Sequence, residues 1–242
     1  MTSSALAAGP YASLDAFDDW GIRALVTTRD AGTFSTSSDE PAAAVLGRWD
    51  ALRAHLFGDP DVGRLVTARQ VHGARVLVHD GAWVGWLRGP AADGHLAPER
   101  GTALAVSVAD CVPVFVAHPS GATALLHSGW RGTEANIVAE AVRLLAAHGL
   151  PASELRVAMG AAICGRCYEV SPDVHRRLTG REVAAPTPVD LRAIIADQAR
   201  ALGVRDVRPE APCTRCDNER FFSHRAGDPG RQVGVLYAPR SG

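Results

Sequence analysis

The chain has 242 residues, of which 47% are hydrophobic, and a formal net charge of −1. This length can bury a substantial core, and the composition excludes a disordered chain and a generic polyanion binder, so no nucleic-acid partner is expected. The chain contains no lysine, which excludes Schiff-base and Walker-type lysine chemistry. Any bound phosphate must therefore be held by arginine, by backbone N–H groups or by a metal.

The N-terminal segment and the cysteines favour a cytoplasmic protein. Residues 1–15 lack the basic region of a secretory signal, and no segment has the apolar length of a membrane span. The five cysteines are an odd number, which argues against a disulfide framework. Because no linker-like tract divides the chain, residues 1–242 are expected to form a single domain, with residues 1–20 loosely ordered. A monomer or a homodimer is compatible with these features.

Hydrophobic periodicity predicts a mixture of helices and strands. Helices are predicted from about Asp39 to Phe57, from about Thr133 to Gly149 and from about Pro188 to Leu202. Strands are predicted at residues 64–69, 75–80, 102–110, 112–118, 122–127 and 232–237. These elements do not alternate as regular βαβ units, and the short turns between residues 102 and 127 favour antiparallel or mixed pairing. The pattern is typical of the α+β class.

Three residues with soft metal-binding side chains lie at the ends or junctions of these predicted strands. His72 is part of QVHG, Cys111 is part of ADCVPV, and His127 is part of HSGWRGT. Two imidazoles and one thiolate leave a tetrahedral zinc ion one ligand short, and catalytic zinc uses that open position for water or substrate. The three are far apart in sequence, and a lone cysteine in an apolar run is usually a small buried residue. Their sequence context therefore has to supply the specificity.

Together with these three motifs, two further segments make the sequence resemble a known family. They are GAAICGRCYEV (160–170) and CTRCDNERFFSHRAGDPGRQ (213–232). The order of the five motifs resembles the YfiH-like family, whose members carry the labels laccase domain and polyphenol oxidase and are purine nucleoside phosphorylases. The resemblance runs from about Thr27 to about Gly234.

The resemblance implies a fold, a metal site and an activity. The fold would be a layered α-β-β-α sandwich with mixed sheets, and the metal ligands and catalytic residues would be His72, Cys111 and His127. The metal would be zinc, with copper as a possibility. The implied substrates are adenosine, inosine and S-methyl-5'-thioadenosine together with phosphate, and the products are the free base and (methylthio)ribose 1-phosphate. Adenosine deamination is expected as a side activity, because zinc can generate a nucleophile from water that attacks the purine ring.

Arginines within the motifs are the candidates for binding phosphate. Arg29, Arg131 and Arg225 are proposed for this role, because a guanidinium can form two parallel hydrogen bonds with an anion. The residues after His127 also turn into a predicted helix, whose first N–H groups could bind an anion. For each arginine, a solvent-exposed ion pair is the alternative.

The remaining four cysteines leave two alternatives open. Cys167, Cys213 and Cys216 could bind zinc with Glu169 as proton shuttle, as in cytidine-type deaminases. The same residues with Cys164 form two C-x-x-C pairs, the ligand pattern of a structural four-thiolate zinc site.

Other classes of function also remain open at this stage. Cys111 and His127 could be the nucleophile and base of a cysteine hydrolase. Copper-dependent polyphenol oxidation would need many clustered histidines, and no H-x-H occurs in the sequence. A binding module without catalysis is the last alternative.

Overall fold

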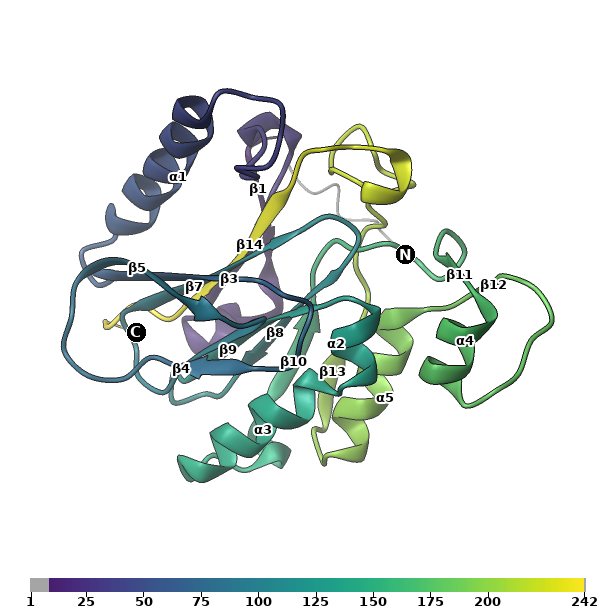
Figure 1. Ribbon diagram of the computed structural model, residues 1–242. Helices are drawn as coiled ribbons and strands as arrows, with labels where there is room; N and C mark the ends of the chain where they lie inside the picture. Colours follow the sequence, from purple (N-terminus) through teal and green to yellow (C-terminus); the bar gives the residue numbers. More distant parts are fainter. Residues whose placement is uncertain (1–8, 242) are drawn as a thin grey trace.

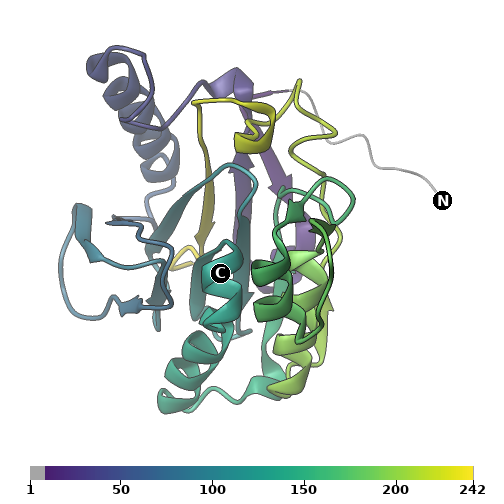
Figure 2. The ribbon, with the colours of Figure 1, turned by 45° about the vertical axis from the view of Figure 1, so that its right-hand side comes forward.

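Two six-stranded β-sheets lie face to face between layers of helices in the computed structural model, which describes residues 9–241 (Figures 1 and 2). The first sheet has the order β1 (Tyr11–Leu14), β2 (Arg23–Thr27), β14 (Gln232–Tyr237), β7 (Thr102–Val108), β3 (Arg64–Arg69) and β5 (Gly85–Ala91). The second has the order β13 (Asp206–Arg208), β10 (Arg156–Met159), β8 (Val112–Ala117), β9 (Thr123–Ser128), β6 (Gly94–Ala97) and β4 (Val76–Val78). Both sheets combine parallel and antiparallel pairs.

The helices and short elements complete the structure. The helices are α1 (Ala42–Phe57), α2 (Trp130–Glu134), α3 (Ile137–Ala147), α4 (Pro172–Thr179) and α5 (Leu191–Ala201). The 3-10 helices among residues 9–241 are η1 (Asp15–Trp20), η2 (Arg29–Ala31), η3 (Ala152–Glu154) and η4 (His224–Ala226). A two-stranded sheet pairs β11 (Glu169–Val170) with β12 (Thr187–Pro188). No helix of residues 9–241 is long and apolar enough to cross a membrane.

The side chains of β8 show why the layers form. Val112, Val114 and Val116 join the core that contains α3 and α5, whereas Phe115 and Ala117 join the core between the two sheets. Successive side chains of a strand point to opposite faces, so a strand that is apolar on both faces needs a partner layer on each side.

On the far side of the first sheet, α1 provides the outer layer. Its buried residues Val45, Trp49, Leu52 and Leu56 pack against this sheet. The predicted α-β-β-α sandwich with mixed sheets is confirmed.

The chain crosses from the first sheet to the second three times at the same edge. The crossings run from β3 to β4, from β5 to β6 and from β7 to β8. Because β3, β5 and β7 are parallel to one another, their carboxyl ends meet at one edge of the sandwich. Strand β9 runs antiparallel to β6 and β8, so it ends at that same edge. This topology therefore brings residues of the three connections close to the end of β9.

Two expectations about helices need correction. The helix expected from Thr133 to Gly149 is divided, because Asn136 has a left-handed backbone (φ 52°) and its side chain caps α3 by accepting a hydrogen bond from the backbone N–H of Ala139. The helix expected from Pro188 begins at Leu191, where the Asp190 carboxylate caps the first turn.

The N-terminal expectation also needs correction over part of its length. Residues 11–20 form β1 and η1 rather than a loose segment, because β1 pairs with β2 and Phe17 is fully buried in the core between the sheets. Residues 1–8 of that expected segment lie outside the described residues.

The strands expected between residues 102 and 127 do not all belong to one sheet. Only β8 and β9 pair there, and they are antiparallel.

Candidate metal centre

The three candidate ligands meet at the edge where the chain crosses between the sheets. His72 lies in the β3–β4 connection, Cys111 in the β7–β8 connection, and His127 in β9. One nitrogen of each histidine and the Cys111 sulfur all lie within 4.8 Å of one another. Two imidazoles and a thiolate at this spacing fit a zinc ion, and His72 is exposed to solvent.

A fully buried carboxylate, Asp93 in the β5–β6 connection, organises two of these ligands. Its Oδ1 accepts a hydrogen bond from His127 Nδ1 (2.9 Å) and one from the backbone N–H of His72 (2.8 Å). Its Oδ2 accepts from the backbone N–H of Gly73 (2.7 Å), and the N–H of Val71 also points at this carboxylate. The hydrogen bond between Asp93 and His127 Nδ1 directs His127 Nε2 toward Cys111 and His72, as a carboxylate commonly does for a metal-binding histidine.

The protonation states of Cys111, His127 and Asp93 depend strongly on one another. Burial raises the pKa of the Cys111 thiol, but His127 and His72 outweigh burial and bring it down to about 6. Burial lowers the pKa of His127, but Cys111 and Asp93 outweigh burial and raise it to about 9. Burial also raises the pKa of Asp93, yet hydrogen bonds from His127 and Gly73 bring it below its ordinary value. At neutral pH the metal-free site therefore holds a thiolate beside an imidazolium.

The backbone around the ligands is unusual. His72 (φ 59°) and Asp110 (φ 76°) have left-handed conformations, which non-glycine residues adopt at a cost of about 1–3 kcal/mol. Asp110 is held by hydrogen bonds from the Thr214 hydroxyl (2.6 Å) and from the backbone N–H of Arg225 (2.7 Å). A side chain at Gly129 would place its Cβ 2.8 Å from Cys111 Sγ, so glycine is needed there. The structure maintains a strained conformation at the candidate ligands, as functional sites often do.

A pocket of about 250 Å³ opens beside His72 and Cys111. Arg131 and Arg225 bring positive charge to its lining, and Trp130 and Tyr168 contribute aromatic rings. Burial, and then the nearby Cys111 thiolate, raise the pKa of Tyr168 to about 12, so its hydroxyl stays protonated at neutral pH. The pocket thus combines two candidate metal ligands, two arginines and two aromatic rings.

The expected phosphate-binding residues do not all reach this pocket. Arg131 lies over the Trp130 ring, and Arg225 donates to the Glu169 carbonyl (2.8 Å) and lies over Tyr168. The expected helix start after His127 is only the five-residue α2, whose dipole is small, so the arginines are the main cationic groups.

Arg29 lies outside the pocket. Its guanidinium forms an ion pair with Asp228 (2.5 Å) and donates to the Asn218 carbonyl (2.6 Å). These contacts engage Nε and Nη2 of Arg29 and connect it to the C-terminal segment, and its role in binding phosphate stays a prediction.

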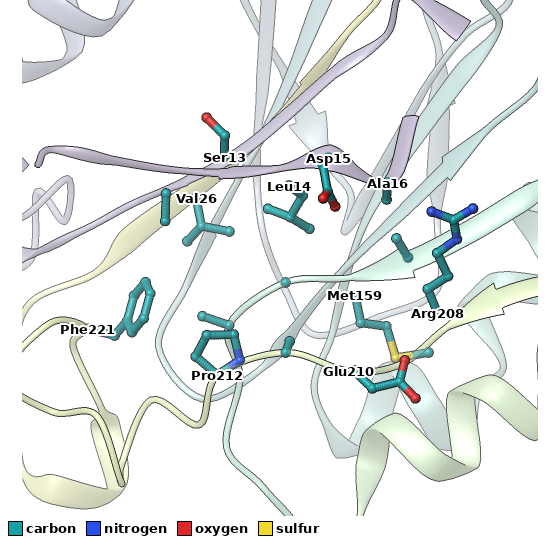
Figure 3. Close-up of a pocket in the computed structure, with 15 residues that line it drawn as sticks. Ser13, Leu14, Asp15, Ala16, Val26, Met159, Arg208, Glu210, Pro212 and Phe221 are labelled. Atoms are coloured by element: carbon teal, nitrogen blue, oxygen red, sulfur yellow. The ribbon is translucent and has the colours of Figure 1, made fainter. Parts of the chain in front are cut away.

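A second pocket, of about 320 Å³, lies between β1 and β10 (Figure 3). Leu14, Val26, Met159 and Phe221 provide much of its apolar lining. None of the three candidate ligands lines it. The candidate site is therefore the smaller pocket at the sheet crossings, where ligands, charges and backbone strain coincide.

The sequence interpretation had missed Asp93, Tyr168 and His224, the last of which also lines the pocket. Asp93 follows a short apolar run in the sequence AADGH, a pattern that also suits an ordinary turn. Its role depends on the neighbouring crossing that carries His72, and that proximity is a property of the topology. Tyr168 and His224 lie inside two of the motifs already recognised, at residues 160–170 and 213–232. Membership of these motifs was the sequence feature that could have identified both residues as part of the site.

The fold and the site together define a mixed α/β domain with a candidate metal site at the crossings between two sheets. The model of the family described as multi-copper polyphenol oxidoreductase laccase matches residues 26–238, and the chain belongs to this family.

Relatives and solved structures agree with that assignment. A Streptomyces coelicolor protein named purine nucleoside phosphorylase is 36% identical, with 91% of this chain and 93% of the relative covered. A Mycobacterium tuberculosis protein of the same name is 36% identical over 89% of this chain and 92% of its own. YlmD from Geobacillus stearothermophilus has a similar structure (TM-score 0.84, 27% identity), with 96% of this chain and 97% of YlmD covered.

Proposed function

We propose that the chain is a zinc-dependent purine nucleoside phosphorylase that acts on adenosine, inosine and S-methyl-5'-thioadenosine in the cytoplasm. The observation that carries this proposal is the set of His72, Cys111 and His127 within 4.8 Å, beside a pocket that two arginines line. The names of the relatives at 36% identity support the reaction class. An adenosine deaminase side activity belongs to the same proposal.

In phosphorolysis, a phosphate oxygen forms a bond with C1 of the ribose as the bond from C1 to the purine nitrogen breaks. The purine nitrogen takes up a proton, and ribose 1-phosphate leaves. Arg131 and Arg225 would hold the phosphate, because a guanidinium binds phosphate through charge-assisted hydrogen bonds. The protonated hydroxyl of Tyr168 would offer a neutral donor, and the Trp130 ring an apolar surface, to the nucleoside.

The donor set fits zinc, and the residues have distinct tasks in holding it. His72, Cys111 and His127 would bind the ion, and Asp93 would fix the orientation of His127. Bound there, zinc would act as a Lewis acid and, for deamination, lower the pKa of water. The same two-histidine, one-cysteine set also suits copper, so the metal has to be measured. Apart from this trio, the one other cluster of three or more ligands in residues 9–241 contains only cysteines, which does not favour multicopper oxidation.

A cysteine hydrolase is the second candidate, and one observation favours it. Cys111, His127 and Asp93 have the order of contacts of a nucleophile, a base and an orienting carboxylate. In this reaction Cys111 would bind substrate instead of metal. Alkylation of Cys111 that saturating zinc fails to slow would favour the hydrolase, whereas full protection by zinc would favour the metal enzyme.

Product analysis tests the proposal directly. Metal-quantified protein is incubated with each of the three nucleosides, with and without phosphate, and the bases and sugars are separated. We expect release of free base that depends on phosphate, together with slower formation of inosine from adenosine. A His72→Ala variant gives the matched control, because it should lose metal and both activities together. Metal-loaded protein that forms no product from any of the three nucleosides would contradict the proposal.

A further inference from the structure

A second cluster of sulfur ligands lies outside the candidate active site. The Sγ atoms of Cys164, Cys167, Cys213 and Cys216 all lie within 4.8 Å of one another. A tetrahedral zinc ion with Zn–S bonds of about 2.3 Å places neighbouring sulfurs about 3.8 Å apart. Cys167 and Cys216, whose sulfurs are 3.5 Å apart, are close to that spacing and far from the roughly 2.0 Å of a disulfide bond.

Two C-x-x-C turns build this cluster from distant parts of the sequence. In the first turn, the Cys164 carbonyl accepts hydrogen bonds from the N–H groups of Cys167 (3.0 Å) and Tyr168 (3.1 Å). In the second, the Cys213 carbonyl accepts from the N–H of Asp217 (2.9 Å). A parallel bridge between Ala162 and Cys213 holds the two turns side by side. The arrangement is that of a structural zinc site made from two paired turns.

Backbone donors and nearby cations suit thiolate ligands at this position. Cys213 Sγ accepts hydrogen bonds from the N–H of Cys164 (3.2 Å) and from the N–H of Cys216 (3.4 Å). Each turn also has an arginine before its second cysteine, Arg166 in the first and Arg215 in the second. Four thiolates and one zinc ion carry a net charge of −2, which these two cations partly offset.

The fourth sulfur excludes the deaminase interpretation of these residues. That interpretation needs three ligands and an open position for water, with Glu169 beside it. Here Cys164 supplies a fourth sulfur within 4.8 Å of the other three, and Glu169 is an exposed residue in β11. A site closed by four protein ligands is the structural kind, because it leaves no position for water or substrate.

We propose that Cys164, Cys167, Cys213 and Cys216 bind a second zinc ion that fastens the C-terminal segment to the active site. Residues next to the ligands make the connection. Tyr168, after Cys167, lines the candidate pocket, and Thr214, after Cys213, donates its hydroxyl to Asp110, the neighbour of Cys111. The second zinc thus stabilises the strained β7–β8 connection without contacting substrate. This inference holds whichever reaction the active site performs.

Metal analysis of the full chain tests the inference. Wild type, Cys111→Ala and Cys216→Ser are purified under reducing, anaerobic conditions, and zinc per chain is measured after removal of loosely bound metal. We expect two zinc ions in the wild type and one in each variant. Glu219→Gln, a change at an exposed residue in the same segment, is the matched control and should keep two.

X-ray absorption at the zinc edge of Cys111→Ala supplies a measurement that needs no change in the cluster, in case Cys216→Ser fails to fold. We expect four sulfur neighbours around its single zinc. A Cys111→Ala protein without zinc would overturn the inference, as would fewer than four sulfur neighbours. A protein whose intact mass shows two disulfide bonds would also overturn it.

Discussion

The two sulfur-containing clusters of this molecule differ in the way they are built. The cluster of His72, Cys111 and His127 comes from connections between the sheets and the end of β9, and it includes an exposed histidine. The four-cysteine cluster comes from two C-x-x-C turns joined at one bridge between Ala162 and Cys213. The first can offer a metal three ligands and the second can offer four.

The number of protein ligands separates a catalytic metal site from a structural one. A three-ligand site keeps a position for a reactant, and it needs further residues, here Asp93, to orient its ligands. A four-ligand site has no such position, and its contribution is to folding free energy. Variants that remove one sulfur from each cluster test whether the two clusters have these different roles.

The largest expected effect is the loss of activity in Cys111→Ala. This change removes a metal ligand, so we expect nucleoside turnover to fall by at least about a hundred- to a thousandfold. Cys216→Ser, the matched loss of one sulfur in the other cluster, should lower turnover by less than about tenfold while lowering the melting temperature. Steady-state kinetics and thermal unfolding of both variants check this. Equal losses of turnover would break the distinction between the two clusters.

Asp93→Asn should have the next largest effect. An amide keeps only one acceptor oxygen, so its NH₂ must replace either Oδ1, which accepts from His127 Nδ1 and the His72 N–H, or Oδ2, which accepts from the Gly73 N–H. In either orientation the neutral amide holds His127 less firmly than the carboxylate does. We expect zinc affinity of the trio to fall by about 10–100-fold. Competition with a chelator, performed in the Cys216→Ser background, measures this affinity. Asp80→Asn, a change at an exposed aspartate, should leave it unaltered. Unchanged affinity in Asp93→Asn would remove Asp93 from the site.

The sequence could select the three candidate ligands because each lies in a distinctive motif, and the structure brings these residues together. It could also identify the α+β class from its periodicity. It could not show that β7 and β8 belong to different sheets. Both strands are apolar on both faces. Their continuous hydrophobic runs indicate that the strands are buried, but they do not indicate which sheet each strand joins. The layered sandwich came from the family resemblance, and the structure confirms it.

The missed features of the site have the same origin. Asp93 acquires its role from the proximity of the β5–β6 and β3–β4 connections, which no local pattern encodes. Arg29 lies in a recognised motif, yet Asp228 and the Asn218 carbonyl engage its guanidinium. Motif membership indicated that these segments matter, whereas the contacts decide which side chain faces the pocket.

Zinc binding to the trio should depend on pH in a defined way. The free site has the pKa of Cys111 lowered to about 6 and that of His127 raised to about 9. Zinc needs the thiolate and the neutral imidazole. Between about pH 6 and pH 9, Cys111 is already deprotonated and His127 still holds a proton, so binding releases one proton. Affinity should then rise about tenfold per pH unit in this range, and more steeply below it.

Calorimetry in buffers of different ionisation enthalpy counts the released protons, and Cys216→Ser protein confines the signal to the trio. Release of two protons at pH 7.5 would show that the Cys111 thiol is protonated in the free site. In the Asp93→Asn variant, the upper limit of the pH range in which one proton is released should move below pH 9, because Asp93 is one of the groups that raise the pKa of His127.

The smallest expected effect concerns phosphate binding by Arg131. Two arginines lie near the Trp130 ring, Arg131 at 4.2 Å and Arg177 at 5.1 Å from its centroid, but only Arg131 lines the pocket. Arg177 pairs with Glu134 (2.6 Å). Loss of one charge-assisted hydrogen bond costs about 1.5–3 kcal/mol, so Arg131→Ala should raise the KM for phosphate by about tenfold or more.

Arg177→Ala should change the KM for phosphate by less than about twofold, because an exposed ion pair contributes little. Initial rates at varied phosphate and saturating inosine measure both variants, and the KM for inosine should change less than that for phosphate in Arg131→Ala. Equal effects of the two substitutions on phosphate would mean that Arg131 acts only through its packing on Trp130. The phosphate would then have to be held by Arg225, the other arginine that lines the pocket.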